Sequence, residues 1–229
     1  MNNGANIKTA ELVGVTKTFS RTHSEVVALK DVTFNISTGE MVLLLGPSGS
    51  GKTTFLTLLA GLQKPSSGDV YIFGKRVQDY NLHDLQRLRA RRIGFIFQTF
   101  CLLESIKVID NVTLVMRFAG ISSKTAVIRA TEYLERFGVG HLRNEYPGKL
   151  SLGEKQRVAV VRALASGAQL ILADEPTGSL PTEQGMEIID FLRKSVITDD
   201  VSVVIASHDE RISEFSDRVL SIRDGVLTS

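Results

Sequence analysis

A glycine-rich turn at residues 46–53 constrains this chain more than any other feature. It follows directly on the apolar run 41–45 and consists of Gly46, Pro47, Ser48, Gly49, Ser50, Gly51, Lys52 and Thr53. Glycines let consecutive backbone N–H groups turn inward around an anion, and a helix that begins near Lys52 adds the positive end of its dipole. We expect a polyphosphate here, with Lys52 on its outer phosphates and the Thr53 hydroxyl on a bridging magnesium ion. The alternative, a plain turn between strand and helix, is disfavoured because strand, glycines, lysine and hydroxyl all agree.

Bulk properties limit the partners of the chain. Its 229 residues suffice for one large domain or for a core with a smaller subdomain. With 27 basic and 25 acidic side chains the net charge is +2, so the charge balance demands no nucleic acid. The single cysteine, Cys101, cannot form an internal disulfide, and we expect it to be buried or half-buried. No secretion signal or membrane-spanning run is found, so the chain itself is expected to be soluble and to meet membranes only through another protein.

Apolar spacing predicts an α/β fold as a single domain over 1–229. Alternation within 10–36 predicts an N-terminal antiparallel β flank. The runs 170–173 and 201–205 are apolar on both faces, which is typical of a mostly parallel, covered sheet. From about Thr99 to Leu150 helical spacing replaces strand runs, at 108–118 and 126–137, and the chain closes with a hairpin at 219–227. We therefore expect a nucleotide-binding core at 10–98 and 151–229, and an inserted α-helical subdomain at 99–150.

Polar side chains follow several predicted strands, where a parallel sheet presents residues to a ligand. Asp174 and Glu175 come after the strand at 170–173. Asp174 would hold a magnesium ion, and Glu175 would polarise the water that attacks the terminal phosphate. His208 could hydrogen-bond that phosphate or water, and Gln98 could sense magnesium and water. Taken alone, the acid pair could be solvated and the histidine structural.

A second anion-binding helix start is predicted at Ser151. Ser151 and Glu154 have the spacing of a capping box at the head of a helix that continues through Leu164. Because the chain already has one phosphate cradle, this terminus would serve another nucleotide, or the same nucleotide from another subunit. As a plain helix cap it needs no partner, and both interpretations stay open.

Taken together, these motifs resemble nucleotide-binding subunits of ABC transporters. The resemblance covers about Ala10 to Leu227 and is carried, in order, by the phosphate loop, Gln98, 150–154, 172–178 and His208. Within the family the chain is most similar to the lipoprotein-releasing, macrolide-exporting and cell-division ATPases (LolD, MacB and FtsE-like). The stretches behind this narrower resemblance are 94–98, 102–103, 111–112, 173–178 and 223–225.

The resemblance implies a P-loop NTPase core that hydrolyses ATP with Mg²⁺ and drives a separate integral membrane permease. Two copies would form a head-to-tail homodimer on binding ATP, with two nucleotides between them. The phosphate loop, extended to Thr54, would hold each nucleotide from one side, and Ser151 and Gly153 of the other copy would hold it from the opposite side. Phe19 would stack on the adenine. The chain would then lie in the cytoplasm, peripheral to the inner face of the cell membrane through its partner.

The same resemblance assigns the remaining roles and exposes three departures, of which Glu154 in place of the more usual glutamine is common in similar proteins and fits the capping box. Thr53, Gln98 and Asp174 would bind the metal, and the catalytic groups would be Glu175, His208 and Gln98. Leu152 replaces a glycine of the family signature, and we expect binding to survive. Pro181 replaces an aspartate, so hydrolysis could be slow or coupling altered.

Two other functions are weighed against the energy-coupling ATPase. An ATP-regulated switch with little turnover is conceivable because of Leu152 and Pro181. A soluble ABC ATPase acting on nucleic acid is disfavoured, since the chain has no long coiled-coil insertion and no second cassette. The cluster Arg87, Arg89, Arg91 and Arg92 is interpreted as a solvated helix face rather than a nucleic-acid patch. The transported or extracted molecule is not predicted, because specificity would reside in the membrane subunit.

Overall fold

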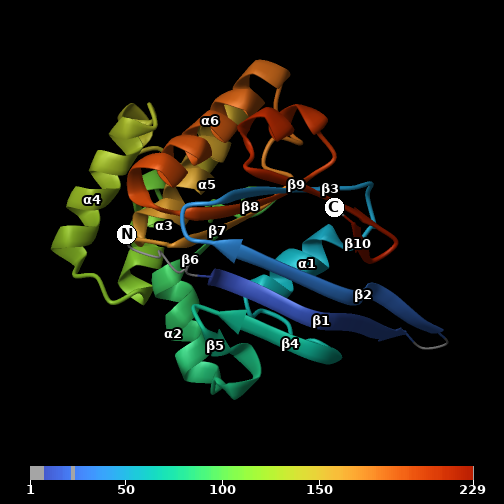
Figure 1. Cartoon of the computed structure of the whole chain (residues 1–229). Coiled ribbons are helices and arrows are strands. Elements are labelled where there is room, and N and C mark those ends of the chain that lie inside the picture. The colour runs from blue at the N-terminus through green and yellow to red at the C-terminus, as the bar shows by residue number, and fades with distance from the viewer. Residues whose placement is uncertain (1–7, 22–23, 229) are drawn as a thin grey trace, which may run out of the picture.

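A six-stranded sheet runs through the middle of the protein (Figure 1). Its strands are β3 (Met41–Leu45), β6 (Ile93–Ile96), β7 (Leu170–Asp174), β8 (Ser202–Ser207), β9 (Arg218–Arg223) and β10 (Val226–Thr228). In this computed structural model, which describes residues 8–21 and 24–228, the spatial order is β10, β9, β3, β8, β7, β6. All neighbours are parallel except β10, which pairs antiparallel with β9. The predicted parallel sheet and closing hairpin are confirmed, with strand ends shifted by one or two residues.

A second, antiparallel sheet lies beside the central one and confirms the predicted β flank. It consists of β1 (Lys8–Arg21), β2 (Ser24–Ser37), β4 (Ser67–Ile72) and β5 (Lys75–Arg76), in the spatial order β2, β1, β4, β5. Leu12 of β1 lies opposite Phe34 of β2 and Val70 of β4. Helix α1 (Lys52–Leu59) is packed between the two sheets, so the phosphate loop that precedes it is held by both (Figure 1).

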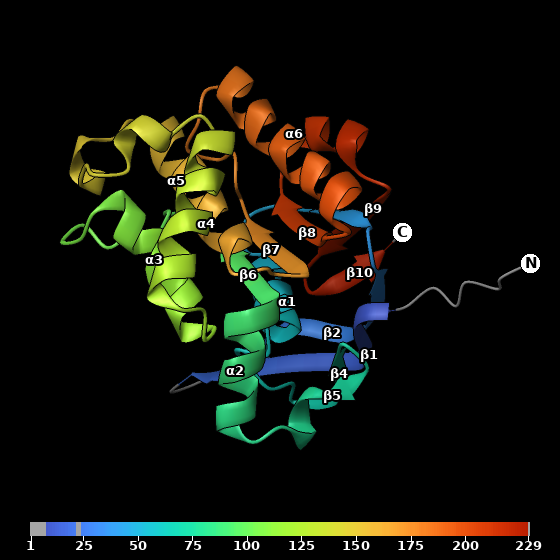
Figure 2. The ribbon, with the colours of Figure 1, turned by 90° about the vertical axis from the view of Figure 1, so that its left-hand side faces the viewer.

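The remaining long helices gather on the opposite face of the central sheet or at its edge (Figure 2). They are α2 (Leu82–Arg92), α3 (Val108–Phe118), α4 (Ser123–Arg136), α5 (Leu152–Ala165) and α6 (Thr182–Asp199), with short 3-10 helices at 77–79, 140–142, 147–149 and 210–215. The prediction of a helix at 108–118 is confirmed. The helix predicted at 126–137 begins three residues earlier, because the Ser122 hydroxyl caps it by accepting the Thr125 N–H at 3.2 Å.

Alternate side chains of the central strands belong to two different hydrophobic cores. Met41 and Leu43 of β3 pack with the layer formed by α3 to α6, whereas Val42 and Leu44 pack with α1 and the antiparallel sheet. Strands β7 and β8 divide their residues in the same way. Both faces of these strands are therefore covered, which explains why the sequence there is apolar without interruption.

Cys101 corrects one expectation, because it is exposed rather than buried. Phe100 and Cys101 both have left-handed backbone conformations, with φ of 57° and 50°. The guanidinium of Arg162 donates to the backbone carbonyls of both residues and holds this turn at the surface. A cysteine is apolar enough to suggest burial, but here the turn geometry decides its position.

Within 8–21 and 24–228, no helix has the length and apolar character needed to cross a bilayer.

Candidate active site

The phosphate loop connects the end of β3 to the start of α1. Gly51 is the N-cap of α1 with a φ of 109°, and a Cβ there would lie 2.5 Å from the Ala28 carbonyl oxygen. A glycine is therefore required both by the backbone conformation and by the close approach of β2. The loop is fixed at its start by the Gly46 N–H, which donates to the Ser207 carbonyl at 3.2 Å. Strand β8 thus holds the loop at the edge of the sheet.

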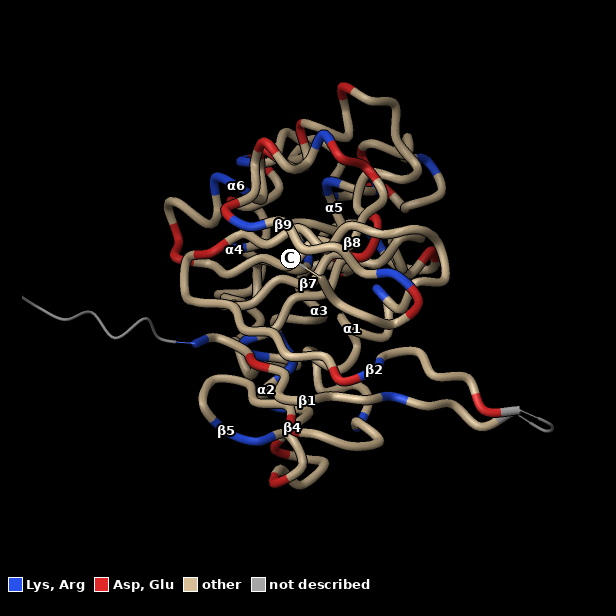
Figure 3. The backbone as a smooth tube through the Cα atoms, turned by 45° about the vertical axis from the view of Figure 1, so that its right-hand side comes forward, with Lys and Arg blue, Asp and Glu red and all other residues tan. Residues whose placement is uncertain are grey.

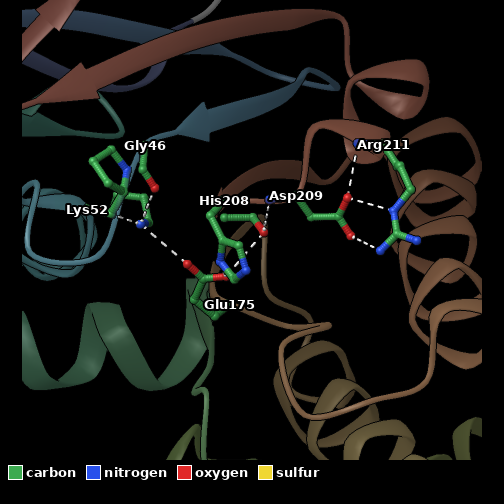
Figure 4. A network of polar contacts seen from close by, with 8 residues as sticks. Gly46, Lys52, Glu175, His208, Asp209 and Arg211 are labelled. Atoms are coloured by element: carbon green, nitrogen blue, oxygen red, sulfur yellow. Dashed lines mark hydrogen bonds and ion pairs between the residues drawn. The ribbon is translucent and has the colours of Figure 1, made fainter.

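Lys52 lies beneath this loop and is almost completely buried. Its Nζ donates to the carbonyl oxygens of Gly46 at 2.7 Å and Pro47 at 3.0 Å. The same ammonium group lies 3.3 Å from Glu175 Oε1 (Figure 4). The lysine and the predicted catalytic glutamate are therefore direct partners in this structure, a contact that the sequence did not predict.

Asp174 and Thr53, which the sequence predicts as metal ligands, are direct hydrogen-bond partners. The Thr53 hydroxyl donates to Asp174 Oδ2 at 2.7 Å. Burial raises the pKa of Asp174, and the neighbouring Glu175 carboxylate raises it further, while the Thr53 hydrogen bond and the Lys52 charge oppose the shift. A buried carboxylate whose charged form is disfavoured gains from a cation beside it.

Glu175 stands at the first position after β7 in a strained backbone conformation. Its φ is 46°, a region that a non-glycine residue occupies at a cost of about 1–3 kcal/mol. Its Oε2 accepts a hydrogen bond from Ser207 Oγ at 3.2 Å and lies 3.0 Å from His208 Nδ1. Figure 4 shows the glutamate between Lys52 and His208, with both side chains directed at its carboxylate. The structure therefore brings together the catalytic residues predicted on two different strands.

These side chains line a cavity of about 780 Å³. Its walls are Val26, Val27, Ala28, Pro47, Ser48, Gly49, Gly51, Lys52, Thr53, Thr54, Gln98, Asp174, Glu175, His208, Asp224 and Gly225. Gln98 thus lies where it was expected. The wall residues from β2 were missed because no motif marks them, and those of the 224–225 turn were missed because the motif there carries no site role in the sequence. Only the topology brings these segments to the loop.

Phe19, the predicted base-stacking residue, lies beside the cavity and is not one of its wall residues. It lies opposite Val26 in the β1–β2 register, with 37% of its surface exposed and the Lys17 ammonium 5.0 Å from its ring centroid. Val26 itself does line the cavity. Stacking of Phe19 on a base therefore stays a prediction.

Ser151 and Gly153 begin α5 and are not wall residues of this cavity. The capping box is complete: Glu154 N–H donates to Ser151 Oγ at 3.3 Å, and Ser151 N–H donates to Glu154 Oε2 at 2.8 Å. Gly153 faces α6, where a Cβ would lie 2.5 Å from Gln184 Oε1. The capping box alone therefore accounts for Ser151 and Glu154 at the start of α5. This helix start is also exposed, with half of the Leu152 surface accessible, so it is free to face another molecule.

The site is chemically suited to a magnesium nucleotide. Ser50 Oγ is buried and makes no hydrogen bond within the described part of the chain, which leaves a polar atom in the loop for a further partner. Thr53 Oγ1 and Asp174 Oδ2 are hard oxygen donors of the kind that Mg²⁺ prefers, and they touch each other beside the loop. These observations agree with a triphosphate over the loop and a metal ion at its side.

The arginine cluster at 87–92 is held by internal contacts to a larger extent than predicted. Arg89 donates to the Gly61 carbonyl at 2.9 Å and Arg91 to the Ala119 carbonyl at 3.0 Å, while Arg92 stacks on the Phe73 ring. Burial lowers the pKa of Arg89 and of Arg92. Elsewhere charges of both signs are interspersed over the elements (Figure 3). The interpretation as a solvated helix face was therefore incomplete, because three of these side chains join α2 to its neighbours.

Comparison with known proteins identifies the family. Residues 29–178 match a family model described as ABC transporter. The chain belongs to the ABC transporter family. This ABC protein is 41% identical to a putative hemin import ATP-binding protein, HrtA, of Staphylococcus epidermidis, over 92% of this chain and 95% of that relative. It is 38% identical to the macrolide export ATP-binding/permease protein MacB of a Shewanella species, over 96% of this chain and 34% of that protein.

A solved structure supports the same placement of this ABC protein. The dimeric structure of a post-hydrolysis state of the ATP-binding cassette MJ0796, bound to ADP and Pi, superimposes with a TM-score of 0.89. Sequence identity is 37%, and the match covers 95% of this chain and 96% of that one. The predicted family, branch and ATPase activity are confirmed: the chain is an ATP-binding and ATP-hydrolysing subunit of the ABC transporter type.

Proposed function

We propose that the chain is a Mg²⁺-dependent ATPase subunit that closes on ATP as a homodimer and thereby drives a separate integral membrane permease. The observation that carries the proposal is the convergence of Lys52, Glu175 and His208 beside the phosphate loop, at 3.3 Å and 3.0 Å from the glutamate's two oxygens. A lysine for phosphate, a carboxylate for water and an imidazole on the far side of that carboxylate are groups that suit phosphoryl transfer to water.

We propose that Lys52 changes partners when ATP binds. In the structure its ammonium group is shared by two loop carbonyls and by Glu175 Oε1. Phosphate oxygens carry more negative charge than a carbonyl and compete for the same ammonium. Transfer of Lys52 to the terminal phosphate frees Glu175 Oε1, which then accepts a proton from the attacking water. His208 leaves Glu175 Oε2 and donates a ring N–H to the terminal phosphate.

We propose Thr53, Asp174 and Gln98 as the residues that hold the magnesium ion. When bound, Mg²⁺ neutralises charge that develops on the phosphates. The desolvated Asp174 carboxylate supplies the anionic ligand, and Thr53 supplies a hydroxyl from the first turn of α1. Gln98 contributes from the end of β6 and joins the site to the helical part of the chain, residues 99–150, which we propose as the inserted subdomain.

The permease is proposed to contact the surface around α2 and α3. A cavity of about 770 Å³ opens there, with walls that include Phe95, Phe97, Leu103, Val115 and Phe118. These side chains suit an apolar segment of a membrane protein's cytoplasmic face. By this route the subunit would lie in the cytoplasm against the inner face of the membrane.

The cargo is proposed to depend on the permease. The relatives' names mention hemin import and macrolide export, at the similar identities of 41% and 38%. That names of such similar relatives mention two such different molecules supports selection of the cargo by the permease.

Glu175→Gln tests the catalytic assignment. The amide keeps the shape but cannot take a proton, so we expect kcat to fall by roughly 10³-fold or more with ATP affinity retained. ATP with Mg²⁺ should also convert this variant from monomer to dimer in light scattering. Glu183→Gln, an exposed glutamate in the first turn of α6, is the matched control and should keep the wild-type rate. Unchanged turnover in Glu175→Gln, or a strictly monomeric ATP-loaded variant, would contradict the proposal.

A further inference from the structure

Ser207 carries a buried hydroxyl at the site, and the proposed function gives this hydroxyl no role. It is the last residue of β8, and its surface is 0% exposed. Its Oγ donates to Glu175 Oε2 at 3.2 Å and accepts the Asp209 N–H at 3.1 Å. The serine therefore bridges the proposed catalytic carboxylate and the backbone that follows His208.

These two contacts fix the direction of the Ser207 hydroxyl. A serine hydroxyl has one hydrogen to donate and two lone pairs that accept. The Asp209 N–H occupies a lone pair, so the hydrogen is left for Glu175. Because the side chain is completely buried, water does not compete for it. Ser207 is thus a donor committed to one oxygen of Glu175.

The other two groups at this carboxylate have second tasks. Lys52 and His208 line the cavity and, in the proposed function, turn toward the terminal phosphate. Ser207 is not a wall residue of the cavity, and its hydroxyl has no route to the nucleotide. It can therefore hold Glu175 while the lysine and the histidine change partners.

We propose that Ser207 is a positioning residue for ATP hydrolysis. It holds Glu175 Oε2, so that Oε1 points at the attacking water and takes its proton while the water oxygen bonds to phosphorus and the bond to the ADP oxygen breaks. The strained backbone of Glu175, with a φ of 46°, does not by itself favour this side-chain position, so the hydrogen bond from Ser207 is needed to hold the carboxylate there. The inference rests on the proposed role of Glu175.

Ser207→Ala in the full chain tests the inference. Loss of a hydrogen bond to a charged group should lower kcat by about 10- to 100-fold. The Kd for ATP, measured under conditions that prevent hydrolysis, should change by less than about threefold, because Ser207 does not touch the nucleotide. Ser207→Thr restores the hydroxyl and should recover most of the rate. A wild-type kcat in Ser207→Ala would overturn the proposal.

Ser202→Ala is the matched control, because Ser202 is a completely buried serine on the same strand. Its hydroxyl lies 2.9 Å from Thr9 Oγ1 and donates to the Ser37 carbonyl at 2.9 Å, away from the cavity. Its loss should lower Tm but leave kcat within about twofold of wild type. Equal losses of kcat in the two variants would assign Ser207 a merely structural role and overturn the proposal.

A double-mutant cycle separates this inference from the proposed function. If Ser207 acts through Glu175, adding Ser207→Ala to Glu175→Gln should slow the reaction by less than about threefold more. Fully multiplicative effects would overturn the inference. Normal turnover in Glu175→Gln overturns the proposed function instead. Should Ser207→Ala fail to fold, Ser207→Cys replaces the hydroxyl by a larger group that is only a weak donor, and a wild-type rate in that variant would contradict the inference.

Discussion

Asp174 shows how a single residue can oppose stability and function. Its carboxylate is buried beside Glu175, and burial raises its pKa. Thr53 and Lys52 only partly offset this cost. An ionised group that the fold disfavours is retained where it has a task, here as the proposed metal ligand.

Asp174→Asn should therefore stabilise the protein while it abolishes magnesium-dependent hydrolysis. The amide oxygen still accepts the Thr53 hydroxyl, but no charge is buried, so the free energy of unfolding at pH 7 should rise by roughly 0.5–2 kcal/mol. A carboxylate with a raised pKa in the folded state contributes stability at low pH that is lost as the pH rises through that pKa. The advantage of the variant should accordingly vanish below about pH 4. Urea unfolding at both pH values checks this, and a less stable variant at pH 7 would contradict it.

Residue identities at the site were predictable where a motif carries them along the chain. Lys52 and Thr53 follow from the loop, and Asp174 and Glu175 from the strand before them. Ser207 was missed because its contact with Glu175 spans 32 residues and arises only when β7 and β8 pair, with Asp174 opposite Ala206. A serine at a strand end has no local signal that separates it from any other.

The departures from the family pattern lie at helix termini. Pro181 is the N-cap of α6 and offers no side-chain hydrogen bond to the helix start. Proline has a suitable backbone geometry, but it leaves the first N–H groups without a capping side chain. Helix α6 is therefore stabilised by its packing against the core rather than by its cap.

Pro181→Asp should add the missing cap. An aspartate at an N-cap stabilises a helix by about 0.5–2 kcal/mol, and its charge also complements the helix dipole. We expect a higher Tm by calorimetry. Pro181→Ala removes the ring without adding a cap and should give no gain. An unchanged Tm in the aspartate variant would show that the loop before α6 does not admit capping geometry.

Helix α5 shows the opposite case, a complete capping box. The Ser151 backbone N–H and hydroxyl both donate to Glu154 and lower its pKa. A carboxylate whose pKa is lowered in the folded state adds stability at pH values above its ordinary pKa. This stability is lost as the pH falls through the folded-state pKa. Glu154→Ala should cost roughly 0.3–1.5 kcal/mol at pH 7. Glu154→Gln retains an acceptor and should lose less, and the penalty of the alanine variant should shrink near pH 3 in guanidinium titrations.

At the scale of the whole molecule, the order of elements was predictable and their mutual placement was not. Periodicity distinguishes strands from helices, so the parallel sheet, the antiparallel flank and the helices near 108–118 and 126–137 were predicted. Which segments meet across the molecule depends on tertiary pairing. The antiparallel flank reaching the phosphate loop at Ala28, and Arg162 fixing the turn at Cys101, are contacts of that kind.

The two hydrophobic cores share the same strands, so the molecule should unfold as one unit. Leu43 faces the helical layer and Leu44 faces α1, and both are completely buried. Leu43→Ala and Leu44→Ala should each lower the free energy of unfolding by about 2–5 kcal/mol and shift one common transition. Val219→Ala, at the position paired with Leu43 but 42% exposed, is the control and should cost less than about 1 kcal/mol. Two calorimetric transitions, each shifted by only one of the leucine variants, would show instead that the helical layer and the antiparallel half unfold as separate cooperative units. The shared sheet couples the two cores only if it unfolds together with both of them.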